Sequence, residues 1–442
     1  MNFRLQNTKK SKNNKKNGGF CHLHFAIWQK YTIFAFVKNQ SHIYIINMEA
    51  FFRTHAYLVE HTNAPVRRML MDEIDWSQPM IGIKGTRGVG KTTFLLQYAK
   101  EHFDIHDRKC LYININNFYF QGRGIANFAG EFYRRGGKVL LIDQVFKEPN
   151  WSNELRMCHD LYPNLKIVFT GSSVMRLKEE NPELGGIVKS YNLRGFSFRE
   201  FLNLKTGNNF KAYSLDEILH DHEHITRRIL PYASPIKYFQ DYLHHGFYPF
   251  FLENRNYSEN LLKTMNMMTE VDILLIKQIE LKYLTKIKKL FYQLAVNRTK
   301  APNISQLAQE IETSRATVMN YIKYLADARL INIIYPPGQK FPKKPSKVML
   351  HNSNLLHAIY PNEITRQEVM ETFFVNSLWK DHKVNQGGKD SFFIVDDSRK
   401  FRICDAQARG KVRMNPDTTY ALYNTEIGKD NQLPLWLLGF LY

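Results

Sequence analysis

A nine-residue loop rich in glycine, with one lysine and three threonines, carries the clearest chemical pattern in this chain. It reads Gly85, Thr86, Arg87, Gly88, Val89, Gly90, Lys91, Thr92 and Thr93, which is the spacing G-x-x-x-x-G-K-T. Glycines let backbone N–H groups approach phosphate oxygens, and a helix N-terminus behind them adds partial positive charge. In such a loop the lysine reaches the β- and γ-phosphates and the threonine hydroxyl binds Mg²⁺. The pattern therefore predicts a site for ATP and Mg²⁺ on residues 85–93.

The segments on either side of this loop are those that a phosphate-binding loop needs. Met80–Lys84 is short and apolar and is predicted to be a buried strand, and Phe94–Ala99 can begin a helix. The alternative is a chance glycine turn before a helix. The strand–loop–helix context favours the phosphate site.

A second buried segment, Lys138–Asp143, ends in a carboxylate about fifty residues after the loop. We expect Asp143 to face Thr92 across Mg²⁺ and to hold its water shell. ATPases of this type usually place Glu next, where it deprotonates or orients the attacking water. Here that residue is Gln144, whose neutral amide can position water but cannot accept its proton. The sequence therefore predicts slow hydrolysis.

Other apolar segments complete a predicted parallel α/β sheet of the P-loop type. The strand Lys166–Ser173 ends in polar residues, where ligands lie in open α/β sheets, so Thr170 or Ser172 is a candidate contact for the γ-phosphate. The alternative reading is a plain Ser/Gly turn. The remaining expected elements are strands at Lys109–Ile115 and Tyr191–Leu193 and helices at Phe128–Arg135 and Trp151–Tyr162.

The composition is that of a globular protein of 442 residues, long enough for several domains, with a net charge of +20. Such a charge suits a polyanionic partner, or it serves only solubility. Residues 1–47 hold eight Lys or Arg and no Asp or Glu. We expect them to be a basic, disordered extension or upstream frame, with the natural start at Met48. Scattered cysteines and interrupted apolar runs predict a cytoplasmic protein without a membrane span.

Residues 214–300 are predicted to be helical, with Ser214 as an N-cap, and the next segment resembles a DNA-binding motif. Ile304–Ile311 reads as one helix, Ser314 caps a second helix at Arg315–Leu325, and a strand at Leu330–Tyr335 follows. Pro336–Lys344 would form a basic wing. This order predicts a winged helix.

The second helix of that motif offers polar side chains for nucleic acid. Its exposed face would present Arg315, Thr317, Asn320 and Lys323, which suit phosphate contacts and base edges. The alternative is that the motif only packs between the nucleotide domain and the C-terminal residues. Both readings stay open on the sequence alone.

Taken together, the stretches GTRGVGKTT, LLIDQVFKEPNW, IVFTGSS and LRGFSFREF resemble the bacterial AAA-family ATPases that carry a C-terminal domain of unknown function. The resemblance covers about residues 48–442 and implies four parts after the extension 1–47: an AAA+ core at 48–205, a helical lid or linker at 206–300, a winged helix at 301–345, and a small α/β, endonuclease-like domain at 346–442. In the last part we expect helices at Leu355–Ile359 and Glu371–Trp379 and paired strands at Ser391–Asp397 and Lys400–Cys404.

Several positions differ from the family's pattern. Gln144 and Phe146 stand where Glu and His are usual, and Gly185–Gly186 stands where arginines are usual. The remaining candidates for a phosphate-contacting arginine are Arg176, Arg194 and Arg199. In the C-terminal part, Arg402 and Ala406 replace an acidic residue and a lysine, and Glu371, Asp390 and Asp396 do not complete a nuclease metal site.

The sequence thus predicts an AAA-type ATPase that binds ATP and Mg²⁺, with Lys91, Gln144 and Thr170 as catalytic candidates and Thr92 and Asp143 as metal ligands. The alternative is a regulatory module without significant turnover, in which nucleotide controls binding to DNA or to an unknown protein partner.

Overall fold

We describe the protein from a computed structural model that covers residues 48–177, 179–253, 256–297, 301–359, 364–388, 391–405 and 415–442. The predicted extension 1–47 lies outside these residues. The chain divides into one compact unit that ends at Thr54, whose described residues 48–54 are helical, and a second from His55 to Tyr442.

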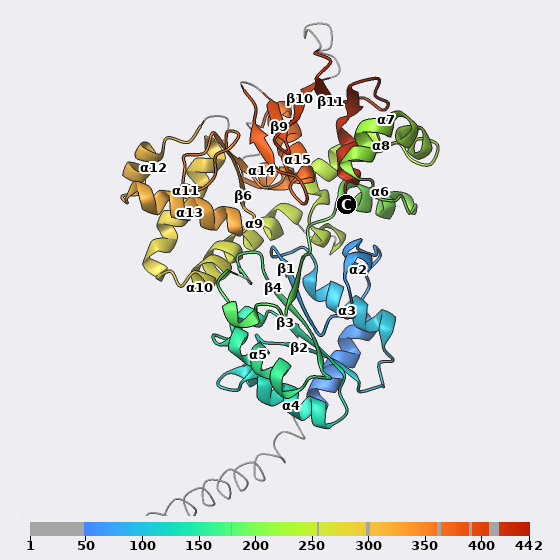
Figure 1. Ribbon diagram of the computed structural model, residues 1–442, viewed down its shortest axis with the longest axis vertical. Coiled ribbons are helices and arrows are strands. Elements are labelled where there is room, and N and C mark those ends of the chain that lie inside the picture. The colour runs from blue at the N-terminus through green and yellow to red at the C-terminus, as the bar shows by residue number, and fades with distance from the viewer. Residues whose placement is uncertain are drawn as a thin grey trace, which may run out of the picture. The chain divides into compact units, whose positions relative to one another are not determined.

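A five-stranded parallel sheet organises the first half of the second unit, as the sequence predicts (Figure 1). Its strands lie in the order β2-β3-β4-β1-β5 and are β1 (Met80–Gly85), β2 (Cys110–Asn114), β3 (Val139–Asp143), β4 (Lys166–Ser172) and β5 (Lys189–Asn192). Gly85 is in register with Ser172, and Asn114 with Asp143. The polar residues that end four of the strands therefore meet at one edge of the sheet.

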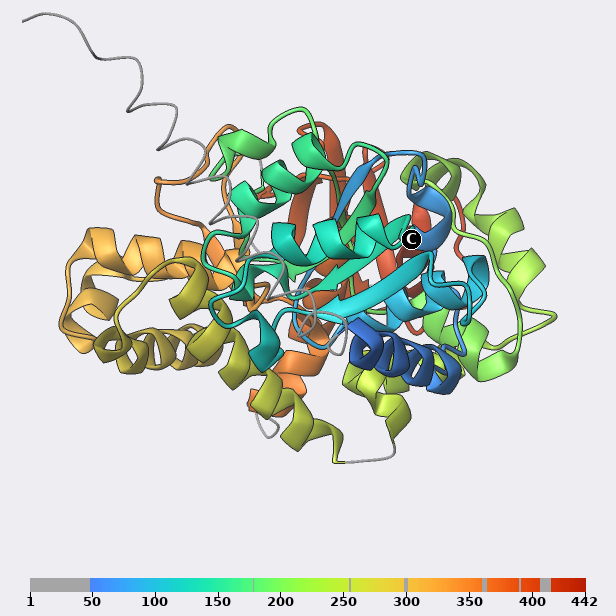
Figure 2. The same cartoon turned by 90° about the horizontal axis from the view of Figure 1, so that it is seen from below.

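Helices cover both faces of this sheet. They are α3 (Lys91–His102), α4 (Ile125–Arg134) and α5 (Trp151–Leu161), and Figures 1 and 2 show α3 on the side opposite to α5. The chain crosses from β1 to β2 in one direction and returns through β3 and β4 in the other, so right-handed connections place α3 and the other two helices on opposite faces. Burial on both faces explains the mostly apolar runs of β1 to β4, whereas the edge strand β5 is polar and not buried.

A helical segment follows the sheet, as expected. It begins after the short α6 (Phe198–Thr206), and Ser214 caps α7 by accepting from the Glu217 N–H at 3.2 Å. Two turns of π-helix, η4 (Tyr242–Gly246) and η6 (Met268–Ile273), interrupt the helices there. The regular helices are α7 (Leu215–Ile229), α8 (Pro235–Asp241), α9 (Tyr257–Met267), α10 (Leu274–Ile276) and α11 (Leu284–Val296).

Two helices and a two-stranded antiparallel sheet occupy the region of the predicted winged helix. They are α12 (Ile304–Glu310), α13 (Arg315–Asp327), β6 (Ile331–Ile334) and β7 (Lys347–Leu350). Ser314 caps α13 through a 3.1 Å bond from the Thr317 N–H, as the sequence predicts. The strand β7, which closes the hairpin, was not expected.

The remaining residues form a second, mixed sheet with two helices. Its strands run in the order β12-β11-β10-β9-β8, and β9 (Phe392–Val395) pairs with β10 (Arg399–Asp405) in antiparallel fashion, as predicted. α15 begins five residues before the predicted helix because Thr365 caps it with Glu368. The other elements are β8 (Val384–Gln386), β11 (Thr418–Tyr423), β12 (Gln432–Pro434), α14 (Ser353–Ile359), α15 (Arg366–Leu378) and the 3₁₀ segment η9 (Leu435–Phe440).

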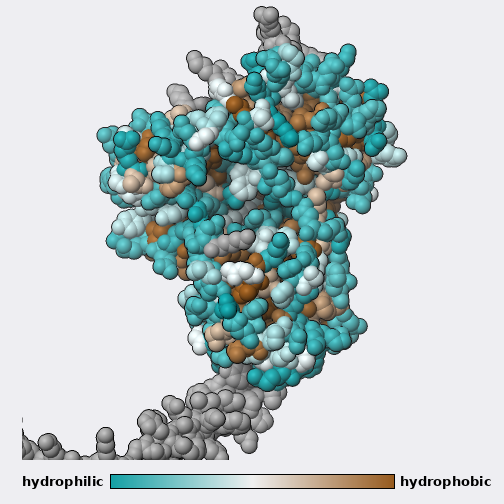
Figure 3. All heavy atoms as spheres, viewed as in Figure 1, coloured by the Kyte–Doolittle hydropathy of each residue, from teal (hydrophilic) through white to brown (hydrophobic). Residues whose placement is uncertain are grey.

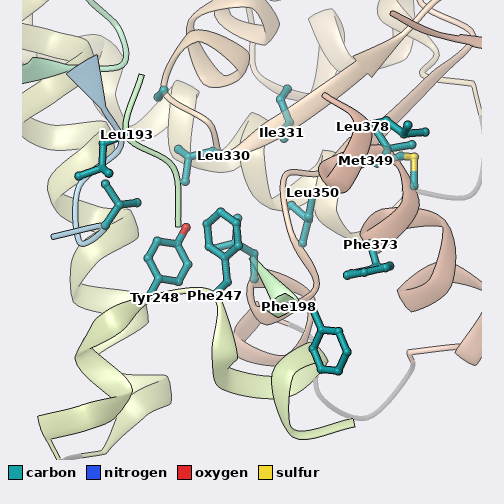
Figure 4. Packing of buried hydrophobic residues seen from close by; sticks show 14 of the residues in the cluster. Leu193, Phe198, Phe247, Tyr248, Leu330, Ile331, Met349, Leu350, Phe373 and Leu378 are labelled. Carbon is teal, nitrogen blue, oxygen red and sulfur yellow. The ribbon is translucent and has the colours of Figure 1, made fainter. Parts of the chain in front are cut away.

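One apolar cluster joins the helical segment to the last hundred residues. Phe247 and Tyr248, both buried, lie between Leu193 after the first sheet and Leu330 and Leu350 of the hairpin region (Figure 4). The face of the protein that Figure 3 displays is mostly hydrophilic, with small separate hydrophobic patches. Among the described residues, no helix has the length and apolarity needed to cross a bilayer.

A buried ion pair ties the segment before the loop to the segment after the sheet. The Arg68 guanidinium donates to both oxygens of Glu200, at 3.1 and 3.2 Å, and also to the carbonyls of Val89, Arg194 and Gly195. Glu200 also accepts from the Ser197 N–H at 3.2 Å as part of a capping box at the start of α6. Both charges are therefore paired and fully hydrogen-bonded, which a buried pair requires.

We predict that Arg68→Met destabilises the protein by about 3–5 kcal/mol, because buried Glu200 loses the guanidinium that donates to both of its oxygens and is left with the longer ion pair with Arg199 at 3.9 Å. The matched control is Arg67→Met, which removes a half-exposed arginine paired with Asp72 and should cost about 1 kcal/mol or less. Urea unfolding of the two variants measures the difference. Equal losses of unfolding free energy in the two variants would contradict the prediction that the buried pair contributes more than the exposed one.

Candidate functional site: a nucleotide cavity over residues 85–93

A cavity of about 430 Å³ lies over the glycine loop, at the carboxyl edge of the parallel sheet. Seven of the nine predicted loop residues line it, together with Asp143, Gln144 and Ser172 from the ends of β3 and β4. The other side is built from residues that the sequence did not mark, among them Arg68 from before the loop and Pro249, Phe250 and Asp272 from the helical segment. A cavity of this size suits a nucleotide.

The loop has the backbone that its glycines allow. Gly88 and Gly90 adopt φ values of 85° and 91°, in the left-handed region that favours glycine. The loop then leads directly into α3, which begins at Lys91, three residues before the predicted start. A side chain at Gly88 would also lie 3.1 Å from the Phe250 ring. The loop N–H groups and the helix N-terminus are thus placed for phosphate, with Phe250 against the loop.

Lys91 contacts its own loop. Its Nζ donates to the carbonyls of Gly85 and Thr86, each at 2.8 Å. Burial lowers the pKa of Lys91 to about 8, an effect that the charges of Asp272 and Asp143 oppose. A phosphate group would raise that pKa again by adding negative charge beside the ammonium.

Asp143 and Thr92 face each other as predicted. The Thr92 hydroxyl donates to Asp143 Oδ2 at 2.7 Å. The same oxygen accepts from the Tyr112 hydroxyl at 2.9 Å, and Oδ1 accepts from the Thr170 hydroxyl. A threonine hydroxyl beside a fixed carboxylate is a suitable donor set for Mg²⁺. Tyr112 is a residue that the sequence did not reveal, since its side chain in β2 reads only as part of an apolar strand.

The two candidates on β4 have different surroundings. Thr170 is fully buried beneath Asp143, and its hydroxyl also accepts from the Gln144 N–H at 3.0 Å. Ser172 lines the cavity, and its hydroxyl donates to Asp272 at 3.3 Å. Of the two residues, Ser172 has the place that suits a phosphate contact, and Thr170 orients Asp143 and the backbone of Gln144.

Two predicted loop residues face away from the cavity. Thr86 is buried, and its hydroxyl donates to the Ala328 carbonyl at the end of α13, at 3.2 Å. At Gly85 a side chain would meet the Leu193 carbonyl at 2.5 Å, so this glycine is required by packing against the residue after β5. The loop thus touches the nucleotide cavity on one side and α13 on the other.

The candidate phosphate-contacting arginines all have other partners. Arg176 pairs with Asp327 at 3.0 Å, Arg194 donates to the Asn376 carbonyl, and Arg199 donates to the Tyr442 backbone oxygen at 3.1 Å. None of the three lines the cavity. The arginines that do line it are Arg68 and Arg87.

The acidic residues of the last part do not gather. Glu371 pairs with Lys347 and accepts from Ser391, and Asp396 bonds His382 at 2.7 Å. Asp390 and Ala406 lie outside the described residues. Within the described part of the chain, no group of three His, Cys, Asp or Glu residues is arranged to hold a metal ion.

Comparison with protein families places this site in a known class. Residues 77–202 match the family described as an AAA domain, which supports the coarse class that the sequence predicted, a P-loop domain of the AAA type. Residues 236–365 match a family described only as a domain of unknown function.

Relatives of known sequence or structure are distant. An uncharacterized protein of Methanocaldococcus jannaschii is 26% identical over 287 residues, which cover 61% of this chain and 60% of that protein's length. Among solved structures, PCH-2 of C. elegans is 18% identical over 36% of this chain and 44% of its own, with a TM-score of 0.22. The Aeropyrum pernix ORC1 protein in complex with DNA is 10% identical over 71% of this chain and 92% of its own, with a TM-score of 0.27.

The pKa of Lys91 predicts how nucleotide affinity depends on pH. Above pH 8 the free protein holds Lys91 largely neutral, so binding a triphosphate requires uptake of a proton. The dissociation constant for ATP should therefore rise about fivefold from pH 8 to pH 9 and about tenfold per unit beyond. Titration calorimetry at several pH values measures this. Lys91→Met is the control: it should bind more weakly, with no such rise, and a flat profile for the native protein would contradict the prediction.

Proposed function

We propose that this protein binds ATP with Mg²⁺ over residues 85–93 and hydrolyses it slowly. The observation that supports this best is the arrangement of Lys91 and the Thr92–Asp143 pair around one cavity. Lys91 would contact the terminal phosphates, and loop N–H groups would hold the others. Thr92 and Asp143 would hold Mg²⁺, which neutralises charge on the phosphate oxygens when bound.

Slow turnover follows from position 144. Gln144 lines the cavity directly after Asp143, where its amide can orient a water molecule. An amide cannot take the proton of that water, and general-base help contributes on the order of 10²–10⁴ in rate. The backbone of Gln144 has a φ of 57°, and its N–H donates to the Thr170 hydroxyl. These features do not involve the Gln144 side chain, so we expect a glutamate at this position to keep the same backbone.

We expect Gln144→Glu to raise the rate of phosphate release about tenfold or more, because it places a carboxylate beside Asp143. Lys91→Ala should reduce release to background and weaken nucleotide binding. Steady-state phosphate release with ATP and Mg²⁺ measures both. If the native protein releases phosphate no faster than Lys91→Ala, hydrolysis is contradicted. If the two proteins also bind nucleotide with equal affinity, the nucleotide site itself is contradicted.

A second candidate function is a regulatory module in which nucleotide controls contact with DNA or a protein. The observation that favours it is the double contact of the loop, where Thr86 bonds the end of α13 while Arg87 lines the cavity. The first turns of α13 stay available: Arg315 and Asn320 are exposed, and Lys323 lies 4.3 Å from the Phe341 ring in the predicted wing. Thr317, the fourth predicted DNA-contacting residue, bonds the Ser314 cap at 2.9 Å.

If residues 301–345 act as a DNA-binding winged helix, affinity for a DNA duplex should fall steeply with salt. The double variant Arg315→Ala/Lys323→Ala should flatten the slope by about two units, because each lost phosphate contact removes about one released counterion. Lys263→Ala, an exposed lysine on α9 paired with Glu259, is the control and should leave the slope unchanged. If the protein binds no DNA duplex, either with or without ATP, DNA binding is contradicted and a protein partner remains as the alternative.

A further inference from the structure

We propose that Asp272 partly replaces the carboxylate that position 144 lacks, as the proton acceptor for the water that attacks the γ-phosphate. This role rests on the proposed ATP hydrolysis. Asp272 comes from the π-helical turn η6, 129 residues after Asp143 in sequence, in a segment that reads only as helical core. Its place beside the loop is a product of the fold.

Asp272 lines the cavity beside the glycine loop. Its side chain is buried, and Oδ1 accepts from Arg87 Nη2 of the loop at 2.6 Å. Oδ2 accepts from the Ser172 hydroxyl at the carboxyl end of β4, at 3.3 Å. β4 lies beside β3, which ends at Asp143, and Asp272 lines the same cavity as Gln144, the position where a catalytic Glu is usual. The longer bond to Ser172 leaves Oδ2 the less strongly held oxygen.

Two other carboxylates line this cavity within the described chain, and neither suits the role. Asp143 is already bonded by Thr92, Tyr112 and Thr170, and it is the candidate for Mg²⁺. Glu253 is exposed, on the short 3₁₀ segment η5 (Pro249–Glu253). Asp272 is the buried carboxylate that remains.

Two positively charged side chains lie near Asp272. Arg87 pairs with it directly, and Lys91 is near enough that the Asp272 charge opposes the lowering of the lysine's pKa. A triphosphate on the loop offers Arg87 a second anion, and a guanidinium can bond phosphate and carboxylate together through its several N–H groups. Arg87 would thus connect the nucleotide to the proton acceptor.

The step balances as ordinary hydrolysis. The water oxygen forms a bond to the γ-phosphorus, and the bond from that phosphorus to the β–γ bridging oxygen breaks. The electron pair of the broken bond stays on ADP. The water proton passes to Asp272 Oδ2 and then to solvent, which leaves ADP, phosphate and a proton.

The test compares Asp272→Asn with Asp327→Asn in the full chain. Both substitutions neutralise a carboxylate that pairs with an arginine of the nucleotide domain, but Asp327 pairs with Arg176 outside the cavity. Asp272→Asn keeps the size of the side chain and should lower kcat about a hundredfold while ATP affinity stays close to native. Asp327→Asn should leave kcat near native. Adding Gln144→Glu to Asp272→Asn should restore turnover, which a merely structural defect would not allow.

Three results would overturn the role of Asp272. They are an unchanged or raised kcat in Asp272→Asn, a loss that appears equally in Asp327→Asn, and failure of Gln144→Glu to restore turnover in a variant with native unfolding temperature. ATP binding is titrated in parallel with Lys91→Ala as reference. If the native protein binds ATP more tightly than Lys91→Ala but does not hydrolyse it, the role of Asp272 is contradicted and the nucleotide site remains. If the two proteins bind ATP equally, the proposed function itself is contradicted.

Discussion

The buried pair of Arg68 and Glu200 is the contact on which the nucleotide site depends most. One guanidinium joins the segment before β1, the carbonyl of Val89 inside the loop and the start of α6. Glu200 is fixed in turn by its capping box with Ser197, so the ion pair cannot move without disturbing the start of that helix. A buried charge that lost its partner would be strongly unfavourable. The loop is therefore held in shape by an ion pair between residues that lie outside the loop itself.

The cavity itself is shared between distant parts of the chain. Its floor is the loop and the ends of β3 and β4, and its other wall comes from the helical segment, where Phe250 lies against Gly88 and Asp272 pairs with Arg87. Behind the loop, Thr86 bonds the end of α13. The loop thus contacts elements that follow the sheet on both of its sides. This connection joins the two proposed functions, since the same loop would hold the nucleotide and also bonds the end of α13.

Much of the fold follows from local patterns, and much of the site does not. The strands β2, β3 and β4 are largely apolar runs that end in polar residues, so their place can be predicted, as can the capped helices α7 and α13. The loop and the Thr92–Asp143 pair follow from spacing. Asp272 and Arg68 could not be found in this way, because their ion-pair partners, Arg87 and Glu200, are 185 and 132 positions away. The motif predicts the loop residues that line the cavity, and only the structure shows that Arg68 and residues of the helical segment line it as well.

The measurement that tests this account most directly is a crystal structure of the full chain with Mg²⁺ and an ATP analogue that cannot be hydrolysed. The account predicts the triphosphate over residues 85–93, with Lys91 released from the Gly85 and Thr86 carbonyls to the terminal phosphates and Thr92 on the metal. A water molecule should lie between the γ-phosphate and Asp272. An empty cavity at saturating analogue would contradict the central claim, as would a bound triphosphate that leaves Lys91 on its own loop.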